Sequence, residues 1–319
     1  MDQARQLRNI IKSESAARRS LARVICVTSG KGGVGKSNVA INLAVQLKRL
    51  GQRVIILDAD FGLANIEIMF GTVPKHNLSD LIYQGKNIKD IITPGPMDVG
   101  FISGGAGISD MYNLSIDYLE YIIVNLAELD AIADTIIVDT AAGVSSAVLE
   151  FLVASGEIIL VTTPEPTSIT DSYSLLKALT QYPRFSTDNT VIKCVSNRVT
   201  SDEEGQQLYN KINAVVQRYL KLPMEYLGCI PHDMQLQESV MQQTPVSILY
   251  PNAKSVRAFE SIAAKLTGTE GVSNIKKRGM AAFFSYIISG RKLGESKTKA
   301  KEQINGQQPP QDNKQNEKR

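Results

Sequence analysis

The chain has 319 residues, of which 43% are hydrophobic and 21% are charged, and its formal net charge is +3. This length accommodates one large α/β domain with extensions or two small domains, and the composition is that of an ordinary soluble globular protein. The charge is too small to indicate nucleic-acid binding, and no nucleic acid is expected as a partner. The three cysteines form no Cys-x-x-Cys pair, which argues against a disulfide framework and against a zinc or iron–sulfur site. No apolar run is long enough to span a bilayer, and no signal-peptide core follows the basic N-terminus, so we expect a cytoplasmic protein.

Residues 1–20 are basic and polar, and their composition predicts no more than a frayed or partly helical leader. One segment within them, residues 2–8, reads Asp-Gln-Ala-Arg-Gln-Leu-Arg. It resembles the N-terminal Asp-Gln-Ala-x-x-Leu-Arg motif of FlhG/FleN-like flagellar proteins, which stimulates a GTPase of the signal-recognition-particle type. The resemblance implies such a GTPase as a partner. The contacting residues that it implies are Asp2, Gln3, Ala4, Leu7 and Arg8.

Residues 29–37 read Ser-Gly-Lys-Gly-Gly-Val-Gly-Lys-Ser and contain the spacing of a P-loop. A strand-like apolar run over 23–28 precedes them and a helical pattern over 38–49 follows, which is the context that the motif requires. In such a loop, backbone N–H groups and the helix N-terminus bind phosphate. Lys36 then neutralises the β- and γ-phosphates, and the Ser37 hydroxyl ligates Mg²⁺. Motif and context together disfavour the alternative, a glycine-rich turn that binds nothing.

Lys31 is the unusual residue, because an ordinary P-loop does not require a lysine directly after its first glycine. Taken alone, Lys31 has a solvated surface lysine as its alternative interpretation. Together with Gly32 and Gly33, however, it makes the loop similar to the deviant Walker-A loop of the MinD/ParA family of ATPases. In that family the extra lysine reaches the nucleotide of a partner subunit. The resemblance implies ATP as the nucleotide, an ATP-dependent homodimer, slow hydrolysis, and phosphate contacts from Gly30, Lys31, Gly32, Gly33, Val34, Gly35, Lys36, Ser37 and Asn38.

Two further strand-like runs end in aspartates. The run over 53–57 leads to Asp58 and Asp60, and the run over 135–138 leads to Asp139. Carboxylates at the carboxyl ends of parallel strands can reach the Mg²⁺ of a bound nucleotide, although an Asp-rich turn or a helix N-cap gives the same pattern. The resemblance implies that Asp58 and Asp139 belong to the Mg²⁺ site with Ser37. It implies catalysis by Lys31, Lys36 and Asp60, with Asp60 positioning or deprotonating the attacking water.

Three later strand-like runs carry weaker motifs. Glu165 and Asp171 follow the run over 158–162; the resemblance suggests dimer contacts for them, while a capped helix start is the commoner explanation. The resemblance also implies that Asn197 and Arg198, after the run over 191–195, contact the adenine. It places Pro231, after the run over 227–230, in the base pocket.

Residues 274–292 combine a basic cluster with an apolar stripe at helical spacing, and a second pair of basic residues closes the segment. This pattern favours a helix that lies in a lipid interface, and a core helix packed on the domain is the alternative. MinD-like and flagellar members end in a membrane-targeting helix, so the resemblance implies anionic lipids as partners. The candidate membrane-contacting residues are Ile275, Lys276, Lys277, Met280, Phe283, Phe284, Ile287 and Ile288.

The alternation of apolar strands and helices predicts a single α/β P-loop domain over 21–268, with a mostly parallel sheet and helices on both faces. An extension over 1–20 precedes the domain, and a polar tail over 293–319 is expected to be disordered. The resemblance to FlhG/FleN/YlxH-like regulators implies a cytoplasmic switch ATPase that binds the membrane surface reversibly and controls flagellar number or placement. Flagellar basal-body proteins are then further candidate partners. A MinD-type division-site ATPase, a ParA-type partition ATPase and a nucleotide-stabilised adaptor are the alternatives.

Overall fold

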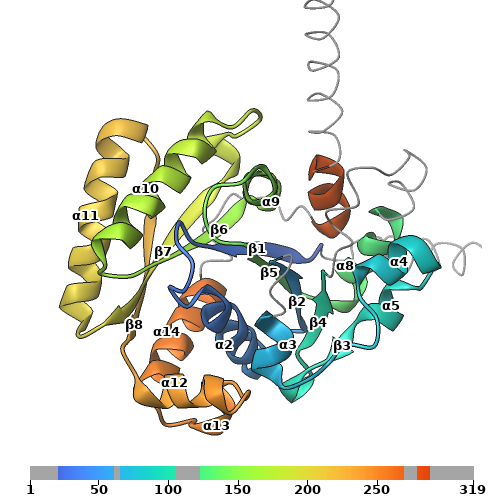
Figure 1. The fold of residues 1–319 in the computed structure, drawn as a ribbon. Coiled ribbons are helices and arrows are strands. Elements are labelled where there is room, and N and C mark those ends of the chain that lie inside the picture. The colour runs from blue at the N-terminus through green and yellow to red at the C-terminus, as the bar shows by residue number, and fades with distance from the viewer. Residues whose placement is uncertain (1–20, 61–64, 105–122, 269–278, 288–319) are drawn as a thin grey trace, which may run out of the picture.

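The computed structural model describes residues 21–60, 65–104, 123–268 and 279–287 (Figure 1). Several predicted contact residues lie outside these ranges. They are Asp2, Gln3, Ala4, Leu7 and Arg8 of the predicted GTPase motif and Ile275, Lys276, Lys277 and Ile288 of the predicted membrane segment.

Within the described residues, eight strands form one sheet in the order β3-β4-β2-β5-β1-β6-β7-β8. Neighbouring strands run parallel except for β3 and β4, which pair antiparallel. The central strands are buried on both faces, which explains their nearly continuous apolar sequences and confirms the predicted mostly parallel sheet. The strands are β1 (Arg23–Thr28), β2 (Val54–Ala59), β3 (Thr93–Pro94), β4 (Gly100–Ser103), β5 (Thr135–Thr140), β6 (Glu157–Thr162), β7 (Val191–Val199) and β8 (Glu225–Pro231).

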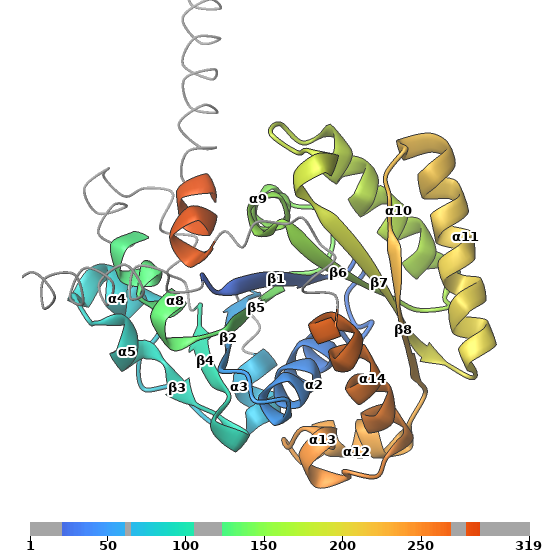
Figure 2. The same ribbon diagram turned by 180° about the vertical axis from the view of Figure 1, so that it is seen from behind.

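Helices cover both faces of the sheet (Figures 1 and 2). One face carries α2 (Lys36–Arg49), α3 (Asn65–Phe70), α12 (Met234–Met241), α13 (Val246–Leu249) and α14 (Lys254–Gly268). The other carries α4 (Leu78–Gln84), α5 (Ile88–Ile91), α8 (Leu129–Ile132), α9 (Ser146–Ser155), α10 (Pro166–Gln181) and α11 (Asp202–Leu220). Two short 3₁₀ turns, η1 (Pro96–Asp98) and η3 (Thr187–Asn189), lie in connections.

Strand geometry divides the hydrophobic core into two layers. Successive side chains of a strand point to opposite faces, so Val24 and Cys26 of β1 join the layer under α9 and α10, while Ile25 and Val27 join the layer under α2 and α14. The sheet therefore separates the two layers and holds the ends of its strands at fixed positions, which is what the site below requires.

A helical segment over residues 279–287, the short red helix of Figure 1, packs beside α8 and α9. Its apolar residues Met280, Phe283, Phe284 and Ile287 are at most 2% exposed. The Phe283 ring lies 5.7 Å from the ring of Phe151 in α9. The domain thus covers the described part of the stripe, which is the alternative interpretation of the sequence, and contact with lipid would require the segment to leave this position.

Polar contacts fix both ends of this segment. The Asp130 carboxylate of α8 accepts the Met280 N–H at 2.9 Å. Near the other end, the Tyr286 hydroxyl donates to the Arg184 carbonyl at 2.6 Å, and the Arg184 guanidinium lies 3.5 Å from the centre of the Tyr286 ring. Burial of the stripe and these contacts together define one docked position for residues 279–287.

Candidate functional site

The loop between β1 and α2 has the backbone that a phosphate-binding loop needs. Gly33 and Gly35 adopt positive φ angles of 77° and 91°, which favour glycine. A Cβ on Gly30 would overlap the backbone of α10 at Asp171, and a Cβ on Gly35 would overlap the Asn197 amide. Close packing therefore requires glycine at the first position of the motif, while φ and packing both require it before Lys36.

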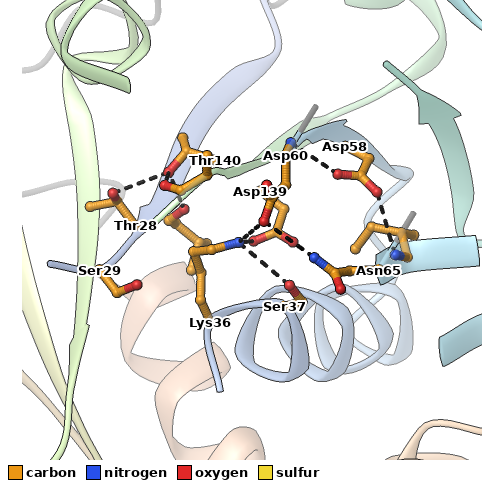
Figure 3. A network of polar contacts seen from close by, with 12 residues as sticks. Thr28, Ser29, Lys36, Ser37, Asp58, Asp60, Asn65, Asp139 and Thr140 are labelled. Atoms are coloured by element: carbon orange, nitrogen blue, oxygen red, sulfur yellow. Dashed lines mark hydrogen bonds and ion pairs between the residues drawn. The ribbon is translucent and has the colours of Figure 1, made fainter. Parts of the chain in front are cut away.

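A lysine and several carboxylates meet where β1, β2 and β5 end (Figure 3). The Lys36 Nζ donates to Asp139 Oδ1 at 2.7 Å and lies 3.4 Å from the Ser37 Oγ. It also lies 3.8 Å from Asp60 Oδ2. The Lys36 side chain is 7% exposed and that of Asp139 is 0% exposed. The sequence-predicted P-loop lysine and two of the predicted aspartates thus share one buried site.

Asp58 completes the group from the neighbouring strand. Its carboxylate accepts the N–H groups of Asp60 at 3.1 Å and of Ile66 at 3.4 Å, so it fixes the backbone where β2 ends and α3 begins. Burial and the negative charge of Asp139 raise the pKa of Asp58 to about 7. The excess of carboxylates over ammonium groups therefore favours a further cation at this site.

The residues at this site fit Mg²⁺. Asp139 Oδ2 is buried and has no hydrogen-bond partner, and burial raises the pKa of this carboxyl although Lys36 opposes the change. An added cation, or water bound to it, would satisfy that oxygen. The described residues contain no group of three or more His, Cys, Asp and Glu that could hold a metal ion. Mg²⁺ in nucleotide sites is usually held by one or two protein oxygens together with substrate phosphates and water, and Ser37, Asp58 and Asp139 are the residues that would lie around it here.

A pocket of about 260 Å³ beside the P-loop collects the predicted base-contacting residues. Asn197, Arg198 and Pro231 line it together with Gly35 and Asn38. The Asn197 amide also donates to the Val34 carbonyl at 2.7 Å, so it supports the loop itself. Five further lining residues were not predicted as base contacts, and their position after β8 was the only sequence signal for them. They are His232, Asp233, Leu236, Gln237 and Val240.

A larger cavity of about 740 Å³ lies at the outer edge of β8, between α11 and α14. It contains none of the P-loop residues and none of Asp58, Asp60 and Asp139. Size alone does not make it the nucleotide site, because phosphate binding depends on the loop backbone and the charged groups described above.

Lys31 lies at the exposed mouth of the loop. Its Nζ donates to Glu165 Oε2 at 2.7 Å and to Thr167 Oγ1 at 2.8 Å, both at the start of α10. The hydrogen bond from this ammonium lowers the pKa of Glu165. Thr167 is a contact that the sequence did not predict, and it places the signature lysine against its own subunit in this structure.

This fold and this loop are those of a known family. Residues 25–246 match the CobQ/CobB/MinD/ParA nucleotide binding domain, which is more than half of the chain. The chain belongs to the MinD/ParA family. The curated proteins similar to it include FleN and the flagellum site-determining protein YlxH, which belong to the FlhG/FleN/YlxH-like branch that the sequence resembles.

Two curated relatives and one solved structure illustrate the similarity. The chain is 37% identical to the antiactivator FleN of Pseudomonas aeruginosa over 262 residues, which are 82% of this chain and 91% of that protein. It is 30% identical to the flagellum site-determining protein YlxH of Helicobacter pylori over 270 residues, 83% and 90% of the two chains. The septum site-determining protein MinD of Pyrococcus horikoshii, solved with Mg-ADP, has a TM-score of 0.61 at 23% identity and covers 80% of this chain and 100% of that one. At that identity the structural match supports the fold.

Proposed function

We propose that this MinD/ParA family member is a switch ATPase of the flagellar-number-regulator type. It binds ATP and Mg²⁺, dimerises face to face through them, associates with the cytoplasmic membrane surface as a dimer, and returns to the monomer after slow hydrolysis. The observation that carries the proposal is the meeting of Lys36, Asp60 and Asp139 beneath a P-loop that has a second lysine at its mouth.

The nucleotide would exchange one set of ionic contacts for another. In this structure Lys36 neutralises Asp139, and both side chains are buried. ATP in the loop would draw the Lys36 ammonium to its β- and γ-phosphates, which leaves the Asp139 carboxylate without its cation. When bound, Mg²⁺ would supply the compensating charge and would neutralise the phosphate oxygens. The site therefore favours the nucleotide together with the metal rather than either alone.

Asp60 is the residue that we assign to the attacking water. Its side chain is 14% exposed and accepts the Asn65 amide at 3.2 Å, which orients the carboxylate at the edge of the buried cluster. A carboxylate in this position can orient a water molecule and accept its proton. Phosphoryl transfer depends mostly on positioning and charge neutralisation, so one carboxylate is compatible with slow turnover.

Lys31 would act on the nucleotide of the partner subunit. Its side chain is 36% exposed, in contrast to the buried Lys36, so it is accessible from outside the subunit. Two ammonium groups at one triphosphate, one from each subunit, would stabilise a dimer only when ATP is bound.

Membrane association would follow from dimerisation. The apolar stripe of residues 279–287 is the segment that we assign to lipid contact, and it would have to leave the domain to make it. Two weakly binding segments in a dimer bind a surface more tightly than one, so the oligomeric state controls membrane binding. No helix in the described part of the chain is long and apolar enough to cross a membrane. We assign the N-terminal motif to a GTPase of the signal-recognition-particle type, and basal-body proteins are further candidate partners.

Size-exclusion chromatography of Asp60→Ala with ATP and with ADP tests the proposal. We expect a dimer with ATP and a monomer with ADP, because the substitution removes the water-orienting carboxylate and leaves the phosphate contacts. ATP turnover should fall by about 100-fold or more. Asp188→Ala, an exposed aspartate in η3, is the control and should turn over like the wild type. Identical elution with both nucleotides, or unchanged turnover in Asp60→Ala, would contradict the proposal.

A further inference from the structure

The ammonium of Lys31 is held by its own subunit. It donates to a carboxylate oxygen of Glu165 at 2.7 Å and to the hydroxyl of Thr167 at 2.8 Å, so two of its three N–H groups have intrasubunit acceptors. Glu165 is the N-cap residue of α10, and Thr167 lies in the first turn of that helix. Both acceptors therefore belong to one element, 134 and 136 residues away along the chain.

The backbone around Lys31 has little freedom to move away from α10. Gly30 packs so closely on α10 at Asp171 and Ser172 that a Cβ would overlap that backbone. On the other side, the Ser29 hydroxyl donates to the Lys31 carbonyl at 2.9 Å. The Ser29 carbonyl also accepts the Gly143 N–H at 2.9 Å. The loop backbone is therefore packed against α10 at Gly30 and hydrogen-bonded to Gly143 at Ser29, so the long side chain of Lys31 is the part that can leave the contacts with Glu165 and Thr167.

We infer that Glu165 and Thr167 form a clasp that retains Lys31 in its own subunit and sets the threshold for its use in trans. The inference rests on the proposed function, in which the same ammonium contacts the partner's triphosphate. One ammonium cannot keep both intrasubunit acceptors and also reach across an interface. Each subunit must therefore open its clasp before a symmetric dimer forms. The association constant of the dimer is then proportional to the square of the fraction of subunits whose clasp is open.

The size of the effect follows from solvent exposure. The side chains of Lys31 and Glu165 are 36% and 52% exposed, so solvent screens this ion pair and the clasp is weak. We expect the clasp to reduce the fraction of open subunits by about three-fold. Because both subunits must be open, the clasp should raise the dimer dissociation constant by about ten-fold. A weak clasp suits a switch, because ATP can still open it.

The sign of the effect distinguishes the clasp from an ordinary interface contact. If Glu165 only contacted the partner subunit, its neutralisation would weaken the dimer. If Glu165 retains Lys31 in cis, Glu165→Gln frees the ammonium and strengthens the ATP-bound dimer. Thr167→Val removes the second acceptor with little change in shape, and it should act in the same direction with a smaller effect.

The first measurement uses the nucleotide-free protein. The full chain is treated with an amine-acylating reagent, and mass spectrometry gives the modification rate of Lys31 relative to the exposed Lys254. We expect this ratio to rise about three-fold in Glu165→Gln, because the ammonium loses its carboxylate partner. Glu203→Gln, an exposed carboxylate at the start of α11, should leave it unchanged. An unchanged ratio in Glu165→Gln would overturn the clasp.

The second measurement uses the Asp60→Ala background with ATP. Sedimentation velocity should give a dimer dissociation constant about ten-fold lower when Glu165→Gln is added. An equal or higher constant would overturn the threshold role. Absence of any ATP-dependent dimer in the Asp60→Ala parent would refute the proposed function and the threshold role with it. The acylation result would then still decide whether the intrasubunit clasp exists.

Discussion

At the scale of single residues, the described part of the chain contains a buried ionic cluster far from the P-loop. Arg23 donates through Nε and Nη2 to both carboxylate oxygens of Glu157 at 2.7 Å, and Lys193 Nζ donates to Glu157 Oε1 at 2.9 Å. Burial acts to raise the pKa of Glu157, but the two cations outweigh it and the pKa is lowered overall. The carboxylate therefore compensates two buried cations on β1 and β7.

Glu157→Gln should lower the free energy of unfolding by about 3–5 kcal/mol at pH 7, because it leaves both cations without their counter-charge. A carboxyl whose pKa is lowered by folding stabilises the protein above its unfolded-state pKa of 4.5. That contribution is lost as the pH falls below 4.5 through the folded-state value, so the difference between wild type and variant should shrink there. Urea unfolding at pH 7 and at acidic pH measures both effects.

Asp134→Asn is the matched control for this substitution. Asp134 pairs with Arg53 at 2.6 Å, but the two side chains are 38% and 52% exposed. Its removal should cost about 1 kcal/mol or less. Glu157→Gln should lose more free energy of unfolding than Asp134→Asn, and its loss should change with pH. If either expectation fails, Glu157 does not compensate the two buried cations.

Several site residues were predictable from the sequence because their signals are local. Lys36 and Ser37 follow Gly35 in the P-loop motif, and Asp58 and Asp139 follow continuous apolar runs. The retention of Lys31 by Glu165 was not predictable, because it joins residues 134 positions apart and depends on how α10 packs on the loop. The residues after β8 that line the pocket beside the P-loop were not predicted for the same reason, because their approach to the loop depends on tertiary packing.

At the scale of elements, the contact between the P-loop and α10 is the tightest constraint on the site. Gly30→Ala would place a Cβ inside the α10 backbone at Asp171 and Ser172, so the loop must move away from the helix. We expect at least about ten-fold weaker binding of a non-hydrolysable ATP analogue, measured by isothermal titration. Gly268→Ala, where a Cβ meets open space, is the control. Wild-type affinity in Gly30→Ala would show that this packing does not position the loop.

Burial of Phe283 holds the segment over 279–287 on the domain. Phe283 is fully buried against Phe151, and Phe283→Ala should weaken docking by about 3–5 kcal/mol. Hydrogen exchange of the amides in 279–287 should then become much faster in the nucleotide-free protein. The control is Ser285→Ala, whose side chain is exposed on the same segment. Equal exchange rates in Phe283→Ala and wild type would mean that the stripe does not hold the segment on the domain.

Elements differ in how far their sequences determine them. The central strands β1, β2, β5 and β6 were predictable because a run that is apolar on nearly every residue fits only a strand buried on both faces or a buried helix, and these runs are short. The two-residue strand β3 has no such run and was not predicted. The stripe from Met280 to Ile287 was ambiguous, because an apolar helix face has the same pattern whether it packs on protein or on lipid. Only the tertiary structure shows that the domain provides a site for it.

At the scale of the whole molecule, α10 and the connection that follows it contact the two regions that the proposed cycle requires. Its first turn holds Lys31, and the connection after its last turn contains Arg184, whose carbonyl accepts the Tyr286 hydroxyl of the docked segment. A single 16-residue helix thus extends between the mouth of the nucleotide site and the covered apolar stripe.

In the proposed cycle, ATP controls membrane binding through dimerisation. The most direct measurement is flotation of the full Asp60→Ala chain with vesicles that contain anionic lipid, in the presence of ATP or of ADP. We expect flotation with ATP and little with ADP, because the paired segments of a dimer bind the surface more tightly than one segment does. Equal flotation with the two nucleotides would contradict it.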